Sequence, residues 1–210
     1  MAGYYIYSVD WDQFQRFMNG DRKLVTEFAE GCDEFDEDEG ITVDWPVGEP
    51  ELTDVLIQHL AKPDWYSELS EFAQELFAGA MGEFLQESDS FGFRLDGDDS
   101  IYWPVIERAC EFHSVEPRTI NEKAVSTFGM RPYRFIPEPH YQRQSADGFV
   151  PMHSLHDPAE VRQMLQEFRE AEEFIMRGDK DTQFDYTERV IPSLEQILTD
   201  NRMLLVQVDY

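Results

Sequence analysis

The clearest hydrophobic pattern of the chain lies in residues 67–87, where apolar side chains recur at intervals of three and four. The apolar positions are Leu69, Phe72, Ala73, Leu76, Phe77, Ala80, Phe84 and Leu85. This spacing lines one face of an α-helix, and glutamate and glutamine residues, Gln74 among them, take the opposite face. A helix with one wide apolar face is only marginally stable in water by itself, so this face must pack against other elements. We therefore predict that residues 67–87 form the central, most buried helix of the core.

Three other stretches are typical of β-strands. Residues 4–9 (YYIYSV) and 203–208 (MLLVQV) are rich in aromatic and aliphatic side chains and nearly lack polar ones. Such residues favour strands, and we expect both stretches to lie inside a sheet. Residues 133–136 (YRFI) lie between prolines, which favour an extended backbone. We predict that they add a strand to the same sheet.

Capping residues indicate where several helices begin and end. Asp10 precedes a helix that we expect to end at Gly20, and Asp21 precedes a second that we expect to end at Gly31. Residues 51–61 and 102–113 also have helical spacing.

The sequence Asp157-Pro158-Ala159-Glu160 matches a capping box with proline at the first helical position. We expect it to open a long helix that ends at Arg177-Gly178, and a last helix from about residue 182 to be bent by Pro192. A length of 210 residues fits one large domain. We therefore predict a single α+β domain, residues 1–210, in which a small sheet containing both terminal strands is covered by several helices.

Three stretches near the ends of the chain carry a resemblance. Residues 3–14 (GYYIYSVDWDQF) combine a Gly-aromatic strand with a Val-Asp-aromatic-Asp sequence that runs into a helix. GDRKLV follows at residues 20–25, and NRMLLVQVDY occupies residues 201–210. These motifs resemble a family of small, acidic, uncharacterised bacterial proteins and also the YfbM-like proteins. The resemblance implies a bacterial α+β protein and carries over no catalytic residue.

Charge is distributed unevenly along the chain, whose formal net charge is −27. Residues 1–112 hold 27 acidic and 6 basic residues, a net charge of −21, and residues 113–210 hold 17 and 11, a net charge of −6. Such a surface repels nucleic acid and anionic lipid and attracts cationic proteins. We therefore expect a basic protein partner and neither a nucleic-acid nor a membrane partner. The alternative explanation is that the acidity serves solubility alone.

The densest acidic run consists of Asp33, Glu34, Asp36, Glu37, Asp38 and Glu39. A calcium-binding EF-hand loop built around Gly40 needs an acidic residue five positions earlier and a glutamate six positions later. This chain has Phe35 and Pro46 there, so the motif fails. We expect a solvated loop, and the functional interpretation of these six residues is that they bind a basic partner.

One tract, residues 117–143, is locally basic. Within it, Arg131, Tyr133, Arg134 and His140 lie among prolines. A guanidinium group binds carboxylate or phosphate, a tyrosine ring stacks on a planar ligand, and an imidazole with a pKa of about 6.5 is a candidate general acid or base. These four residues are the candidate site for an anionic small molecule. In the alternative interpretation, the arginines pair with carboxylates of the chain itself.

Histidines and cysteines do not point to a metal or redox site. His153 and His156 with Asp157 and a third ligand such as His140 would be compatible with zinc, but the capping box accounts for Asp157. His59 lies beside the apolar stripe of residues 51–61, where a packed or rim histidine is expected rather than a metal ligand. Cys32 and Cys110 have no metal or redox spacing. We expect no bound metal and no cofactor.

Other motifs are missing as well. The sequence has no G-x-S-x-G, no glycine-rich phosphate loop and no H-E-x-x-H. It has no run of 18 apolar residues and no signal-peptide pattern, so a cytoplasmic location is expected. The oligomeric state is left open.

Two functional hypotheses follow, and neither assigns or excludes an enzymatic activity. In the first, the chain is a non-enzymatic interaction protein, comparable to immunity proteins and inhibitors, whose acidic N-terminal half binds a basic protein. In the second, Arg131, Tyr133, Arg134 and His140 form a binding or catalytic site for an anionic small molecule.

Overall fold

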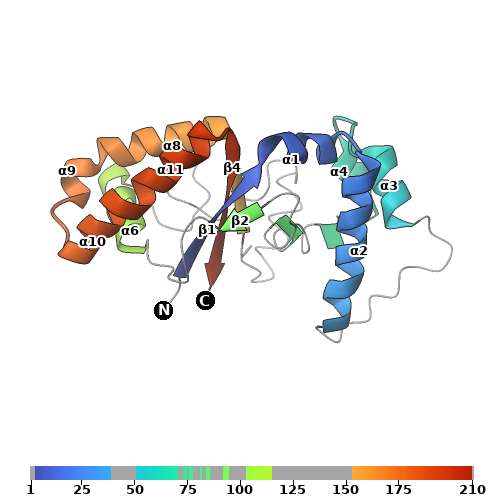
Figure 1. Cartoon of the computed structure of the whole chain (residues 1–210), viewed down its shortest axis with the longest axis horizontal. Helices are drawn as coiled ribbons and strands as arrows, with labels where there is room; N and C mark the ends of the chain where they lie inside the picture. Colours follow the sequence, from blue (N-terminus) through green and yellow to red (C-terminus); the bar gives the residue numbers. More distant parts are fainter. Residues whose placement is uncertain are drawn as a thin grey trace.

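An antiparallel sheet lies at the middle of the molecule, with helices on both of its faces (Figure 1). The computed structural model describes residues 3–38, 51–70, 73–74, 76–77, 81, 84–85, 92–94, 103–114 and 153–209. Within them the sheet has four strands in the order β2 (Gly92–Arg94), β1 (Gly3–Asp10), β4 (Arg202–Asp209) and β3 (His153–His156). Strands β1 and β4 pair along their whole length, from Gly3 opposite Asp209 to Asp10 opposite Arg202. The predicted α+β class, with both terminal strands in one small sheet, is confirmed.

The predicted third strand, residues 133–136, lies outside the described residues. In the described part, β2 pairs with β1 and β3 pairs with β4, so these two short strands flank the long central pair.

Side chains of β4 alternate between two separate apolar clusters, one on each face of the sheet. Met203 and Leu205 belong to the cluster formed with the helices between residues 11 and 85, whereas Leu204 and Val206 belong to the cluster formed with the helices between residues 103 and 199. Successive side chains of a strand point to opposite faces, so a strand that is buried on both faces needs an unbroken apolar run. The sequence MLLV in β4 meets this requirement.

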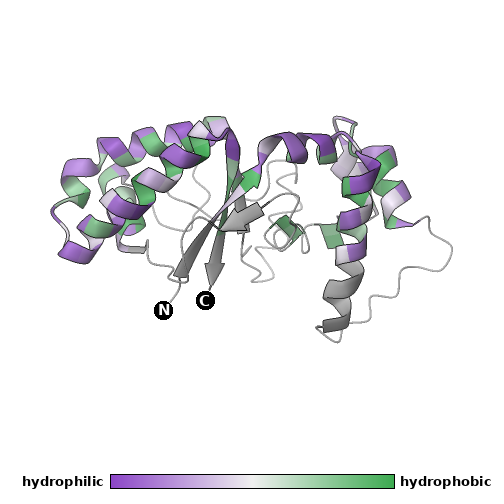
Figure 2. Cartoon of the chain, viewed as in Figure 1, coloured by the Kyte–Doolittle hydropathy of each residue, from purple (hydrophilic) through white to green (hydrophobic). Residues whose placement is uncertain are grey.

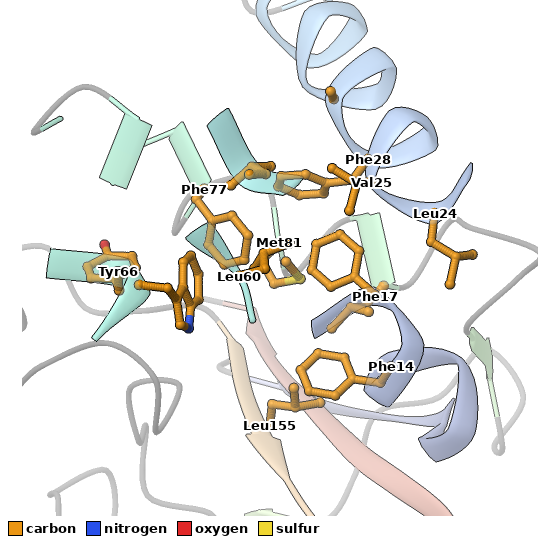
Figure 3. Close-up of a cluster of buried hydrophobic side chains, with 14 of the residues drawn as sticks. Phe14, Phe17, Leu24, Val25, Phe28, Leu60, Tyr66, Phe77, Met81 and Leu155 are labelled. Atoms are coloured by element: carbon orange, nitrogen blue, oxygen red, sulfur yellow. The ribbon is translucent and has the colours of Figure 1, made fainter. Parts of the chain in front are cut away.

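Four helices lie on the side of the first face: α1 (Trp11–Met18), which is next to the strands, and α2 (Arg22–Asp38), α3 (Leu52–His59) and α4 (Trp65–Glu68), which lie farther from them (Figure 1). Aromatic rings fill the space between them. The ring centroid of Phe28 lies 5.1 Å from those of both Phe77 and Phe84, and 5.5 Å from that of Phe17. Figure 3 shows Phe17, Phe28 and Phe77 converging around Met81. Tilted and edge-to-face pairs of this kind add favourable contacts beyond the burial of apolar area.

The predicted helix at residues 67–87 starts later than expected. Glu68 ends the short helix α4, and Leu69 is extended, with φ −71° and ψ 152°. Ser70 then accepts a hydrogen bond through Oγ from the amide of Ala73 (3.3 Å), as a helix-capping serine does. The described residues beyond this point are helical, and their apolar face is in the core, because Ala73, Phe77, Met81 and Leu85 are at most 1% exposed.

The second face of the sheet is covered by α8 (Pro158–Glu170), α9 (Glu172–Ile175), α10 (Lys180–Phe184), a π-helical turn η2 (Asp185–Val190), α11 (Ile191–Thr199) and α6 (Trp103–His113). The capping box at the start of α8 forms as predicted. Asp157 Oδ1 accepts hydrogen bonds from the amides of Ala159 and Glu160, both at 2.8 Å, and Glu160 Oε2 accepts one from the amide of Asp157 at 3.2 Å.

Hydrophilic and hydrophobic residues alternate along α8 and α11, as expected for helices with one buried face (Figure 2). Across the described residues, we find no helix with the length and apolar character that a membrane span requires.

Candidate functional site

The acidic run of the sequence is helical where it is described. Helix α2 does not end at Gly31 but continues to Asp38, so the expectations of a helix end at Gly31 and of a loop after it were wrong. A glycine that ends a helix usually adopts a positive φ. Gly20 does so, with φ 77°, whereas Gly31 is not among the described glycines with positive φ. A Cβ atom added to Gly31 would lie 3.6 Å from the Phe84 ring, so this glycine lies at a packing contact inside the helix.

Acidic residues crowd the second half of α2. Residues 27–38 contain seven acidic residues and no lysine or arginine; the acidic ones are Glu27, Glu30, Asp33, Glu34, Asp36, Glu37 and Asp38. Positions 27, 30, 34 and 37 recur at intervals of three and four and therefore share one side of the helix. This side is opposite Leu24, Val25 and Phe28, which are at most 2% exposed. We call residues 27–38 the acidic segment of α2.

The acidic segment lies at the unfavourable end of its helix. The C-terminal end of a helix dipole is partially negative and favours cations, but the last turn of α2 contains no basic residue. Like charges three or four positions apart also destabilise a helix, by about 0.2–0.5 kcal/mol per pair. Charge alone would therefore weaken this part of α2.

The packed half of the helix holds the acidic segment in place. Leu24, Val25, Phe28 and Ala29 are buried in the aromatic core, and Asp21 accepts hydrogen bonds through Oδ1 from the amides of Lys23 (3.1 Å) and Leu24 (3.4 Å). The side-chain hydrogen bond from Arg16 to Asp21 is the main reason that the pKa of this carboxyl is lowered. Figure 1 shows the C-terminal half of α2 extending beyond α1, α3 and α4.

The other predicted site residues are placed only in part. Asp33, Glu34, Asp36, Glu37 and Asp38 lie on α2. Glu39 lies outside the described residues, as do all four members of the predicted small-molecule site, Arg131, Tyr133, Arg134 and His140. The small-molecule site therefore stays a prediction.

His59 occupies the rim position that its spacing predicted. Its Nδ1 lies 3.0 Å from Glu68 Oε2, which also accepts a hydrogen bond from Lys62 Nζ at 2.9 Å. Hydrogen bonds from Lys62 and then His59 lower the pKa of Glu68. These three groups make a surface ion cluster that joins α3 to α4.

No group of three or more histidine, cysteine or acidic side chains is arranged to hold a metal ion among the residues that the structure describes. His153 and His156 form the two ends of strand β3.

A buried polar row on the second face of the sheet was missed in the sequence. His156 and Glu160 are 1% and 3% exposed, with 3.9 Å between His156 Nδ1 and Glu160 Oε2. Ser8, fully buried on the same face, pairs with Leu204, which also pairs with His156. Serine, histidine and glutamate are the residue types of a nucleophile, a base and an acid. Here, however, Leu204 lies between Ser8 and His156, and the three polar side chains are buried. The row is part of the core, and its signal in the sequence was a histidine at the end of a strand next to a capping box.

Cys110 lacks the lowered pKa of a cysteine nucleophile. Burial is the main cause, and Glu107 a second, of a pKa raised to about 12. The thiol therefore stays protonated at neutral pH, and only the thiolate is reactive.

No protein-family model matches the chain, and no curated protein and no solved structure is significantly similar to it. The resemblance of residues 3–14, 20–25 and 201–210 to a bacterial family therefore stays a prediction. Among the described residues, the acidic segment of α2 is the most unusual concentration of charge, and it is the candidate site.

Proposed function

We propose that this protein is a non-enzymatic interaction protein that binds a basic protein partner through the acidic segment of α2. The observation that carries the proposal is that a segment with seven acidic residues and no lysine or arginine continues a helix whose first half is packed in the core. A solubility function needs only dispersed charge. It does not need charges on consecutive turns of one helix, where they reduce its stability.

The charge spacing fits a cationic surface. Twelve helical residues rise about 17 Å, so the acidic segment carries roughly one charge per 2.4 Å of helix axis. A DNA duplex carries one per about 1.7 Å and a single strand one per about 3.4 Å. Basic proteins that neutralise phosphate backbones would therefore meet a comparable density of negative charge. The same field repels nucleic acid itself.

Binding of this kind has a kinetic signature. Complementary charge accelerates association more than it strengthens the final complex, and added salt screens it. The partner's association rate should therefore fall steeply with salt, while the dissociation rate changes less.

The test compares two variants of the full chain with the same net charge. The first carries Asp33→Asn, Glu34→Gln and Glu37→Gln within the acidic segment. The second carries Glu111→Gln, Glu173→Gln and Glu188→Gln, three exposed residues on other helices. Proteins captured by the wild type from an extract of the source cell at low salt are identified, purified and measured for affinity to all three chains.

The proposal expects a basic protein whose binding the first variant weakens about tenfold, corresponding to about 1.4 kcal/mol over three surface ion pairs. The second variant should bind as the wild type does. Equal weakening by both variants would mean that only net charge matters. Capture of no basic protein, or of one whose association ignores salt, would leave the acidity as a solubility device.

A further inference from the structure

The stretch from α10 through η2 to α11 is continuous, but its middle six residues, Asp185–Val190, form a π-helical turn. The amide of Ile191 donates to the carbonyl of Tyr186, five residues earlier. Pro192 follows in the first turn of α11. Proline has no amide hydrogen, and its ring collides with the carbonyl four residues earlier in a regular α-helix. A wider turn just before Pro192 relieves this collision, and such turns recur at functional sites.

A buried carboxylate begins this turn. Asp185 is 4% exposed, and Arg189 Nη1 lies 3.3 Å from its Oδ1. The Arg189 guanidinium also lies over the ring of Phe184, with Cζ 5.6 Å from the ring centroid. Phe184 is 53% exposed and is one of two large hydrophobic residues exposed in the described part of the chain. One cation thus joins a buried acid to an exposed aromatic ring.

The charges that act on Asp185 come from the π-helical turn and from α10 with its cap. Arg189 lies on the turn itself, Asp181 belongs to α10, and Asp179 caps α10. From α6, Arg108 acts on Asp179. Helix α11 continues with Ile191, Pro192 and Ser193, which carry no charge. Burial first, and then the two neighbouring carboxylates, raise the pKa of Asp185, while Arg189 lowers it.

We propose that Asp185 and Arg189 form a proton-sensitive clamp on the π-helical turn. The ionised carboxylate holds the Arg189 guanidinium over the Phe184 ring. A proton taken from solvent by the carboxylate neutralises it, removes the ion pair and releases the guanidinium. The released arginine leaves the ring of Phe184 open to solvent, so the pH controls one exposed aromatic surface.

The test is an NMR titration of the isotope-labelled full chain that follows the Asp185 carboxyl carbon, the Arg189 side chain and the Phe184 ring. The carboxyl should titrate with a midpoint above its ordinary value of 3.8, and the Arg189 and Phe184 signals should shift with the same midpoint. Asp185→Asn should show the low-pH pattern of both signals at neutral pH.

Arg189→Gln keeps the test decisive if Asp185→Asn does not fold, because Arg189 lies partly at the surface. Without the cation, the Asp185 midpoint should shift upward. Arg177→Gln removes an exposed arginine that does not act on Asp185 and is the matched control, for which the midpoint should not move. A midpoint at or below 3.8, Phe184 signals that ignore the Asp185 titration, or equal effects of the two arginine variants would each overturn the clamp.

Discussion

Tyr66 and Gln74 exchange hydrogen bonds inside the core. Tyr66 Oη donates to the carbonyl of Gln74 at 2.9 Å, and Gln74 Nε2 donates to the carbonyls of Tyr66 (2.9 Å) and Leu69 (3.0 Å). Tyr66 is 3% exposed and Gln74 is 6% exposed. The last carbonyls of a helix have no partner within it, and Gln74 supplies donors at the end of α4. This exchange holds the sharp turn between α4 and the helical residues that follow.

Replacing Gln74 by leucine should therefore destabilise the protein. The variant removes the Gln74 hydrogen bond from two buried carbonyls, of which that of Tyr66 keeps the one from the amide of Leu69 at 3.2 Å. The loss costs about 1–3 kcal/mol. The free energy of unfolding from urea denaturation measures this. Gln58→Leu is the matched control, because Gln58 is exposed on α3, and surface changes usually stay within about 0.5 kcal/mol. Equal stabilities of the two variants would show that the exchange does not hold the turn.

The burial of Gln74 could not be predicted from the sequence. Periodicity placed it among the exposed glutamates of residues 67–87, since a glutamine next to an apolar stripe normally faces water. Only the path of the chain after α4, with Leu69 extended, brings two carbonyls to its amide. Contacts of this kind are tertiary, and no local spacing encodes them.

Helix starts were predicted correctly where a capping residue bonds to amides only two or three positions away. Asp10 accepts a hydrogen bond from the amide of Gln13 at 2.9 Å and starts α1, and Asp157 starts α8 as the capping box predicted. The continuous apolar runs near both ends of the chain correctly predicted the two strands that form the central pair of the sheet. The prediction of a helix end at Gly31 was wrong because a glycine that ends a helix and a glycine at a packing contact have the same sequence signal. Only the contact with Phe84, which the fold creates, shows that Gly31 is of the second kind. The acidic segment was found from composition, but its helical state was not.

The capping box offers a second stability test. Asp157→Ala removes the acceptor for two amides at the start of α8 and should cost about 0.5–2 kcal/mol. Asp64→Ala is the matched control, since Asp64 precedes α4 without a side-chain capping hydrogen bond. Thermal or urea unfolding should separate the two variants. A loss for Asp64→Ala as large as that for Asp157→Ala would argue against the cap as the cause.

Asp185 should make stability depend on pH in a particular direction. Its pKa is raised in the folded state, so the folded chain binds the proton more tightly than the unfolded chain. The resulting stability is present below the unfolded pKa of about 3.8 and is lost as the pH rises through the folded pKa. Asp185→Asn does not titrate and should therefore be more stable than the wild type at neutral pH. Its advantage should shrink on acidification and stop changing below the unfolded pKa. Urea denaturation at several pH values would contradict this if the advantage were constant.

The acidic segment of α2 should show opposite effects on stability and binding. Glu34→Gln with Glu37→Gln removes like-charge repulsion between neighbouring turns and an unfavourable interaction with the helix dipole. The double variant should gain a few tenths to about 1 kcal/mol in unfolding free energy, with the gain decreasing in high salt because salt screens both interactions. Glu111→Gln with Glu173→Gln makes the same change in net charge at exposed positions on α6 and α9 and should gain less.

If the acidic segment serves binding, the more stable α2 variant should also be the one that binds the basic partner more weakly, because evolution retains destabilising charge where function needs it. A variant that gains stability and loses no binding would show that these carboxylates do not contact the partner.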